Sequence, residues 1–149
     1  MGLLDWFRQS FTENEDSIVK AVSKEALLSG FDIKKALDAD MVWKEKLQDV
    51  LDGASVKELN IADASQDNLC ILGKWIYGRG KYLYSHLPEY EVFRKAHAEF
   101  HLCAGEVLAE HLAGNEVKAA KLFNNKFRTA TNKNRLELVR LISMQNRSN

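Results

Sequence analysis

Apolar residues recur at spacings of three and four along most of the chain, whereas the strict alternation typical of strands is scarce. The only proline, Pro88, stands before one of the periodic segments, and glycines follow several others. This pattern predicts long helices over about residues 33–52, 67–80, 88–113 and 115–144, preceded by a shorter one within residues 17–29. We therefore expect an all-α fold, a four-helix bundle formed by residues 31–149, with an additional N-terminal helix in an extension of residues 1–30.

The first long helix has a carboxylate in the middle of its apolar stripe. Asp40 lies on the same predicted face as the apolar residues Ile33, Ala36, Leu37, Trp43, Leu47 and Val50. A carboxylate in such a stripe costs several kcal/mol unless it is paired or bound to a cation. Two interpretations stay open: Asp40 lies at the edge of the stripe beside a lysine or arginine, or it binds a cation in the core.

His97 and His101 stand four residues apart in a segment without glycine or proline. On a helix this spacing places both imidazoles on one face, about one turn apart. The same face carries Phe93, Ala96, Phe100, Ala104, Val107 and Leu108. Each ring has two nitrogens to satisfy away from water, so the two histidines either form a hydrogen-bonded pair or share a metal ion.

Cys70 adds a third type of metal ligand, on the helix predicted over residues 67–80. Taken alone, it is typical of a small buried apolar residue. Gly73 on the same face costs about 1 kcal/mol relative to alanine in a helix, which predicts close packing beside Cys70. Cys103 comes two residues after His101 and faces away from the histidines, so we expect it to pack in the core.

Bundles build metal sites from side chains on facing helices. Together, Asp40, Cys70, His97 and His101 offer one carboxylate oxygen, one thiolate sulfur and two imidazole nitrogens, a set typical of a tetrahedral Zn²⁺ site. Because four ligands leave no open position, such a site is structural or regulatory rather than catalytic. The sequence also contains no glycine-rich phosphate loop and suggests no Ser-His-Asp arrangement, so we do not expect an enzyme.

The composition is that of a globular protein, with 46% hydrophobic and 28% charged residues and a net charge of zero over 149 residues. With two cysteines the chain fits a reducing cytoplasm, where we expect it to be located. No apolar run approaches the roughly 20 residues of a membrane span. Residues 116–149 are basic, but they match no nucleic-acid-binding motif, so we interpret them as a solvated helix face and expect no nucleic acid partner.

Three blocks of the sequence strongly resemble the bacterial chemoreceptor zinc-binding domain, called CZB. They are Cys70-Ile-Leu-Gly-Lys-Trp-Ile-Tyr-Gly-Arg-Gly80, Leu87-Pro-Glu-Tyr90 and His97-Ala-Glu-Phe-His101, and Asp40-Met-Val-Trp-Lys44 resembles the first motif of that family. The resemblance covers about residues 31–145. It implies a four-helix bundle that holds one zinc through three histidines and one cysteine. Cys70, His97 and His101 match family ligands, and Asp40 stands where the family has its first histidine.

The resemblance also implies a function. Such domains usually belong to chemoreceptors or diguanylate cyclases, often as dimers, and they are proposed to sense zinc, or oxidants through the zinc-bound thiolate. We therefore expect a free-standing zinc-binding sensor that forms a homodimer and signals to a chemoreceptor or a cyclic-di-GMP signalling partner. Two alternatives stay open: an adaptor in which zinc only staples the bundle, and a hemerythrin-like bundle that binds iron and oxygen.

Overall fold

The computed structural model describes residues 33–54 and 59–147, and all the regular structure within these ranges is helical. The N-terminal helix predicted in residues 1–30, and the domain boundary placed there, lie outside the described residues. Among the described helices, none has an apolar stretch long enough to cross a bilayer.

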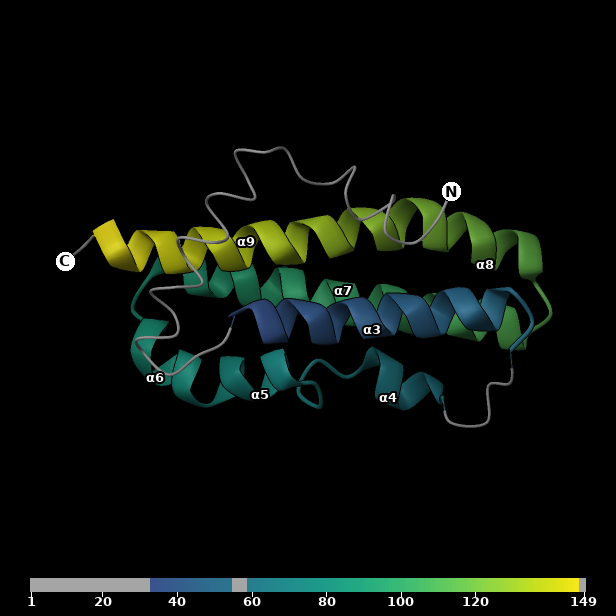
Figure 1. Ribbon diagram of the computed structural model, residues 1–149, viewed down its shortest axis with the longest axis horizontal. Coiled ribbons are helices and arrows are strands. Elements are labelled where there is room, and N and C mark those ends of the chain that lie inside the picture. The colour runs from purple at the N-terminus through teal and green to yellow at the C-terminus, as the bar shows by residue number, and fades with distance from the viewer. Residues whose placement is uncertain (1–32, 55–58, 148–149) are drawn as a thin grey trace.

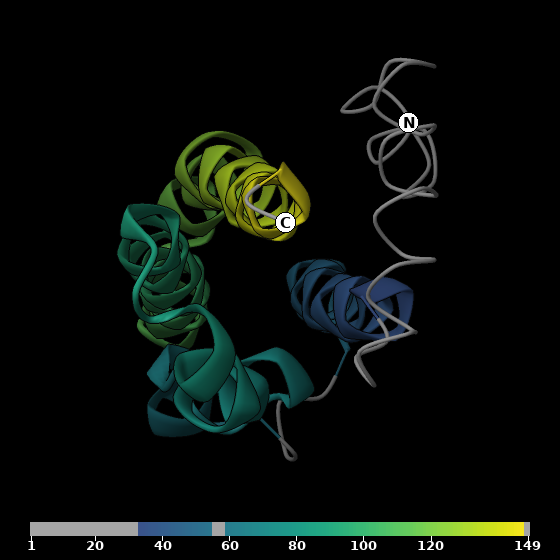
Figure 2. The same ribbon diagram turned by 90° about the vertical axis from the view of Figure 1, so that its left-hand side faces the viewer.

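The helices lie side by side as a bundle with four columns (Figures 1 and 2). One column is α3 (Ile33–Leu51) and another is α7 (Pro88–Leu112). The column that contains the C-terminal residues is formed by α8 (Glu116–Leu122), η1 (Phe123–Phe127) and α9 (Arg128–Arg147). The remaining column is a broken line of α4 (Ile61–Ser65), α5 (Ile71–Tyr77) and α6 (Arg79–Tyr84). The prediction of an all-α four-helix bundle is confirmed.

The broken column differs from the single helix predicted over residues 67–80. Residues 66–70 are not helical, and α5 begins only after Cys70, which is its N-cap. The Cys70 Sγ accepts the backbone N–H of Gly73 at 3.2 Å, as a capping side chain does. Gly78 has φ −109° and ψ −110°, outside the helical region, so it separates α5 from α6 without ending the column. Part of the link expected over residues 81–87 is therefore helical.

The C-terminal column differs from the prediction in a smaller way. The single helix predicted over residues 115–144 contains the π-helical segment η1 between α8 and α9. Both ends of η1 carry buried aromatic residues, since Phe123 and Phe127 are 2% and 0% exposed and their ring centroids lie 5.5 Å apart. The π-turn therefore keeps both rings in the core.

Two apolar clusters form the core, one toward each end of the bundle. The first contains Ala36, Leu72, Trp75, Ile76, Tyr84, Tyr90, Phe93, Leu138, Leu141 and Ile142. The second contains Leu47, Val50, Ala64, Phe100, Cys103, Ala104, Val107, Leu108, Phe123, Phe127 and Ala130. Between them along the sequence of α3, α7 and α9 lie the buried polar residues Asp40, His97 and Asn134, which we call the polar layer. The candidate site lies at this layer.

Gly73 allows the segment before α5 to approach the helix. A Cβ added at this position would lie 1.9 Å from the carbonyl oxygen of Asp67 and 2.8 Å from its carbonyl carbon. The close contact expected beside Cys70 is therefore with this backbone segment.

We expect Gly73→Ala to destabilise the protein. Alanine gains about 1 kcal/mol in helix propensity, but overpacking against a backbone carbonyl costs about 1–3 kcal/mol or more. Urea unfolding of the zinc-free chain measures the difference, and Lys74→Ala, at the neighbouring exposed position, is the control. An unfolding midpoint for Gly73→Ala equal to that of the wild type would contradict this account of the glycine.

Candidate metal centre

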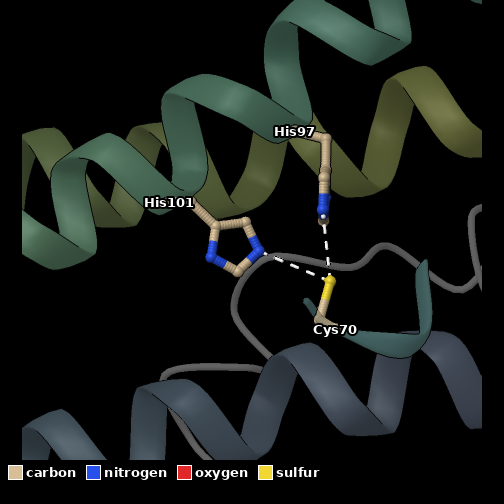
Figure 3. Close-up of side chains that lie close together, drawn as sticks. All are labelled: Cys70, His97 and His101. Carbon is tan, nitrogen blue, oxygen red and sulfur yellow. Dashed lines mark hydrogen bonds between the residues drawn. The ribbon is translucent and has the colours of Figure 1, made fainter. Parts of the chain in front are cut away.

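Three metal-type ligands from two elements converge at the polar layer. The Cys70 Sγ lies 3.3 Å from the Nε2 of His97 and 3.5 Å from the Nε2 of His101. Figure 3 shows both rings projecting from α7 toward the sulfur at the start of α5. The donor atoms of these three residues all lie within 4.8 Å of one another. Both histidines are fully buried, at 0% and 1% exposure.

The other ring nitrogen of each histidine is held by an oxygen acceptor. The Nδ1 of His97 lies 3.0 Å from the Oδ1 of Asn134, and the Nδ1 of His101 lies 3.0 Å from the backbone oxygen of Ala64. Since a carbonyl oxygen only accepts, each Nδ1 carries the proton and donates it. In the neutral rings the Nε2 atoms then have lone pairs, and both lone pairs face Cys70.

The polar atoms around Cys70, His97 and His101 include more hydrogen-bond acceptors than there are protons to donate to them. Besides the two Nε2 atoms and the Cys70 sulfur, the backbone oxygen of Asp67 lies 3.2 Å from the Nε2 of His97. Among these atoms only the thiol carries a proton, and the backbone N–H of Gly73 bonds the sulfur rather than a ring nitrogen. The rings do not supply the missing protons by becoming charged, because burial lowers the pKa of His97 to about 4 and also lowers that of His101. A bound cation would satisfy these atoms.

The spacing of the donor atoms fits a tetrahedral ion. With Zn–N bonds of about 2.0–2.1 Å and Zn–S bonds of about 2.3 Å, a nitrogen and a sulfur ligand lie about 3.6 Å apart. The observed separations of 3.3 and 3.5 Å are close to this value. Burial, and the charge of Asp40, raise the pKa of Cys70 to about 11, so a metal ion at neutral pH must displace the thiol proton.

Asp40 is buried at the polar layer, with 4% exposure, but it does not belong to the group of three converging ligands. Its Oδ2 accepts a hydrogen bond of 2.8 Å from the Nδ2 of Asn134, and its Oδ1 has no hydrogen-bond partner among the described residues. Burial raises the pKa of Asp40 to about 7, although the hydrogen bond from Asn134 acts in the opposite direction. The unsatisfied Oδ1 is a second buried group at this layer that a cation would satisfy.

Asn134 lies in the helix predicted over residues 115–144, and the sequence alone assigned it no part in the site. The structure shows that its amide joins Asp40 to His97, at 2.8 and 3.0 Å. A buried amide at the same level of the bundle as the other polar residues was the signal that could have identified it.

The remaining cysteine and a third histidine lie away from the site. Cys103 is 1% exposed in the second apolar cluster, as predicted, and its Sγ lies 3.6 Å from a carboxylate oxygen of Glu99. Burial raises the pKa of its thiol to about 12, well above the ordinary value of a free cysteine. His111 is bonded locally, with its Nδ1 lying 3.0 Å from a carboxylate oxygen of Glu116.

Comparison with known families identifies the segment that contains the site. Residues 40–108 match the family model of the chemoreceptor zinc-binding domain, CZB. Over this segment the chain is similar to the CZB family. Searches among curated proteins and among solved structures each gave no significant match. The CZB match begins at Asp40 and contains Cys70, His97 and His101, whereas Asn134 lies beyond its end.

CZB domains bind zinc, and the donor set of this chain suits that ion. One sulfur and two imidazole nitrogens are typical zinc ligands, and here both imidazoles are buried and Cys70 is half-buried. The CZB family is regulatory and associated with chemoreceptor signalling, and it is not a known enzyme family. The homodimer implied by the resemblance stays a prediction.

Proposed function

We propose that this chain binds one zinc ion through Cys70, His97, His101 and Asp40, and that the state of the site regulates a partner. The observation that carries the proposal is the convergence of two imidazole lone pairs and a cysteine sulfur, with too few protons to satisfy them. The zinc ion would supply the missing positive charge, and we propose no catalytic step for the chain.

Asp40 is the proposed fourth ligand because its Oδ1 is buried without a hydrogen-bond partner among the described residues. A carboxylate and a thiolate together carry two negative charges, which match the charge of Zn²⁺. The resulting neutral cluster is cheaper to bury than a shell of three imidazoles and one thiolate, which has a net charge of +1. Asp40 also raises the charge density on the sulfur, which favours its reaction with oxidants.

The proposed signal is zinc itself or an oxidant that reacts with the Cys70 thiolate. A thiolate attacks a peroxide oxygen, the O–O bond breaks, and the products are a sulfenic acid and water once a proton is taken up. The Cys70 sulfur also caps α5, so its loss as a ligand and cap would alter the packing of that helix. The partner that reads this change is proposed to be a chemoreceptor or a component of cyclic-di-GMP signalling.

A second candidate is a structural staple, in which the ion only holds α5 against α7. The burial of the site favours it, because both histidines are at most 1% exposed. A hemerythrin-like di-iron site is disfavoured, since the described residues contain a single group of three clustered ligands and a di-iron site needs more.

We expect the full chain, purified without chelators, to contain about one zinc per chain, because four zinc-type ligands complete one tetrahedral shell. Metal analysis gives the stoichiometry and competition with a chromophoric chelator gives the affinity. Cys70→Ala, His97→Ala and His101→Ala should each bind far more weakly, whereas the matched controls Cys103→Ala and His111→Ala should bind as the wild type does. A wild-type chain that neither contains zinc nor takes it up would rule the proposal out.

We expect Asp40→Ala to remain folded and to bind zinc about 10- to 100-fold more weakly, since it loses a ligand or its charge. Asp40→His should restore tight binding with three nitrogens and one sulfur, and Asp40→Asn keeps the size of the side chain while removing its charge. The chelator competition compares all three variants. If Asp40→Ala binds zinc as tightly as the wild type, Asp40 is not a ligand.

We expect mild peroxide treatment to modify Cys70 before Cys103 and to release zinc. A metal-bound cysteine is held as the reactive thiolate, whereas the pKa of the buried Cys103 thiol is raised to about 12. A zinc-sensitive dye follows release, and mass spectrometry maps both cysteines. Modification that appears first at Cys103 would favour the structural staple over the sensor. So would zinc that stays bound to a protein that remains folded after the peroxide treatment.

A further inference from the structure

Asn134 is a buried amide on α9 that contacts both of the other helices of the polar layer. It is 1% exposed, its Nδ2 donates to the Oδ2 of Asp40 on α3 at 2.8 Å, and its Oδ1 lies 3.0 Å from the Nδ1 of His97 on α7. The amide NH₂ therefore faces Asp40 and the amide oxygen faces His97. This orientation leaves one arrangement for the ring, with the proton of His97 on Nδ1.

We propose that Asn134 is a positioning residue that sets two zinc ligands at once. Through its oxygen it fixes the His97 ring with the Nε2 lone pair toward Cys70. Through its NH₂ group it occupies the Oδ2 of Asp40, so that Oδ1 is the carboxylate oxygen left for the ion. The inference rests on the proposed zinc site and adds a residue from the last helix, outside the segment that matches the CZB family.

The positioning matters because a neutral imidazole can carry its proton on either nitrogen. A ring with the proton on Nε2 cannot bind a metal through that atom. His101 has a backbone acceptor, the oxygen of Ala64, that fixes its tautomer, whereas the Nδ1 of His97 relies on a side chain from another helix. Residues that orient metal-bound histidines in this way typically contribute 10- to 100-fold to metal affinity.

Packing alone does not explain an amide at this position. Ala130, four residues before Asn134, belongs to the second apolar cluster, and Leu138, four residues after it, belongs to the first. A leucine at position 134, which has the same number of side-chain heavy atoms as asparagine, would continue the apolar stripe and join the two clusters. The amide instead provides a donor and an acceptor at the level of the ligands.

The test compares Asn134→Leu with Thr131→Val in the full chain. Thr131 is a buried residue one turn away whose hydroxyl donates to the backbone oxygen of Phe127, so its variant controls for loss of a hydrogen bond on α9. Chelator competition should show about 10- to 100-fold weaker zinc binding for Asn134→Leu and unchanged binding for Thr131→Val. Asn134→Ala, which cannot overpack, should give the same loss and serves if the leucine variant does not fold.

Nitrogen-15 spectra of the histidine rings in the zinc-free chain report which ring nitrogen carries the proton. Replacing a residue that only stabilises the fold would not change this tautomer. The wild type should show His97 with its proton on Nδ1, and the Asn134 variants should show a mixture of tautomers. Variants that keep wild-type affinity, or that keep the single tautomer, would overturn the inference. A wild type that binds no zinc would overturn the proposed function instead, and the tautomer comparison would still decide the link between Asn134 and His97.

A double-mutant cycle tests the other half of the contact. Asn134→Asp places two carboxylates face to face, and adding Asp40→Asn restores a donor and an acceptor in exchanged positions. In the zinc-free chain, Asp40→Asn should raise the folding equilibrium constant at least about tenfold more in the Asn134→Asp background than in the wild type. Equal effects in both backgrounds would show that the two side chains are not coupled and would overturn the shared positioning of Asp40.

Discussion

The structure depends on the requirement that polar groups buried across the middle of the bundle be satisfied. Asp40, His97 and Asn134, from three different helices, interrupt an otherwise apolar interior and bond to one another in series. The series ends at the Nε2 of His97, which faces the Cys70 sulfur and the backbone oxygen of Asp67. Hydrogen bonds within the chain therefore satisfy the Asn134 amide and the Nδ1 of His97. They leave the histidine Nε2 atoms beside Cys70 with too few donors, which a cation would replace. The zinc chemistry follows from this shortage.

The breaks in the fourth column belong to the same arrangement. The last carbonyl groups of a helix have no partner within it, and in a helix as short as α4 such a carbonyl, that of Ala64, lies free to receive the proton of His101. A second break places Cys70 at the start of α5, where a backbone N–H can bond its sulfur. A continuous helix through this region would have used both backbone groups in its own hydrogen bonds.

The sequence predicted the parts of this arrangement that depend on local spacing. The helix bounds of α3 and α7 follow from apolar periodicity, and the four-residue spacing of the histidines places both rings on one face. The continuation into α6 was missed because the glycines after α5 were interpreted as the end of a helix, and nothing local indicated that helix extends to Tyr84. The break over residues 66–70 contains no glycine or proline, so neither of the residues that most strongly mark a break was present there. Asn134 was missed because its hydrogen-bond partners lie on two other helices, and the sequence around it does not identify them. Asp40 was recognised as anomalous, but the amide that it meets lies 94 positions away along the chain.

The position of Asn134 on α9 bears on where the folding unit ends. A chain cut at residue 108 would retain every zinc-type donor discussed above and the whole segment recognised by family comparison. It would lack the column that supplies Leu138, Leu141, Phe127 and Ala130 to the two apolar clusters, as well as the amide between Asp40 and His97. The segment matched by the family model therefore ends before the packed helical unit does. Experiments on the site need a chain that includes α9.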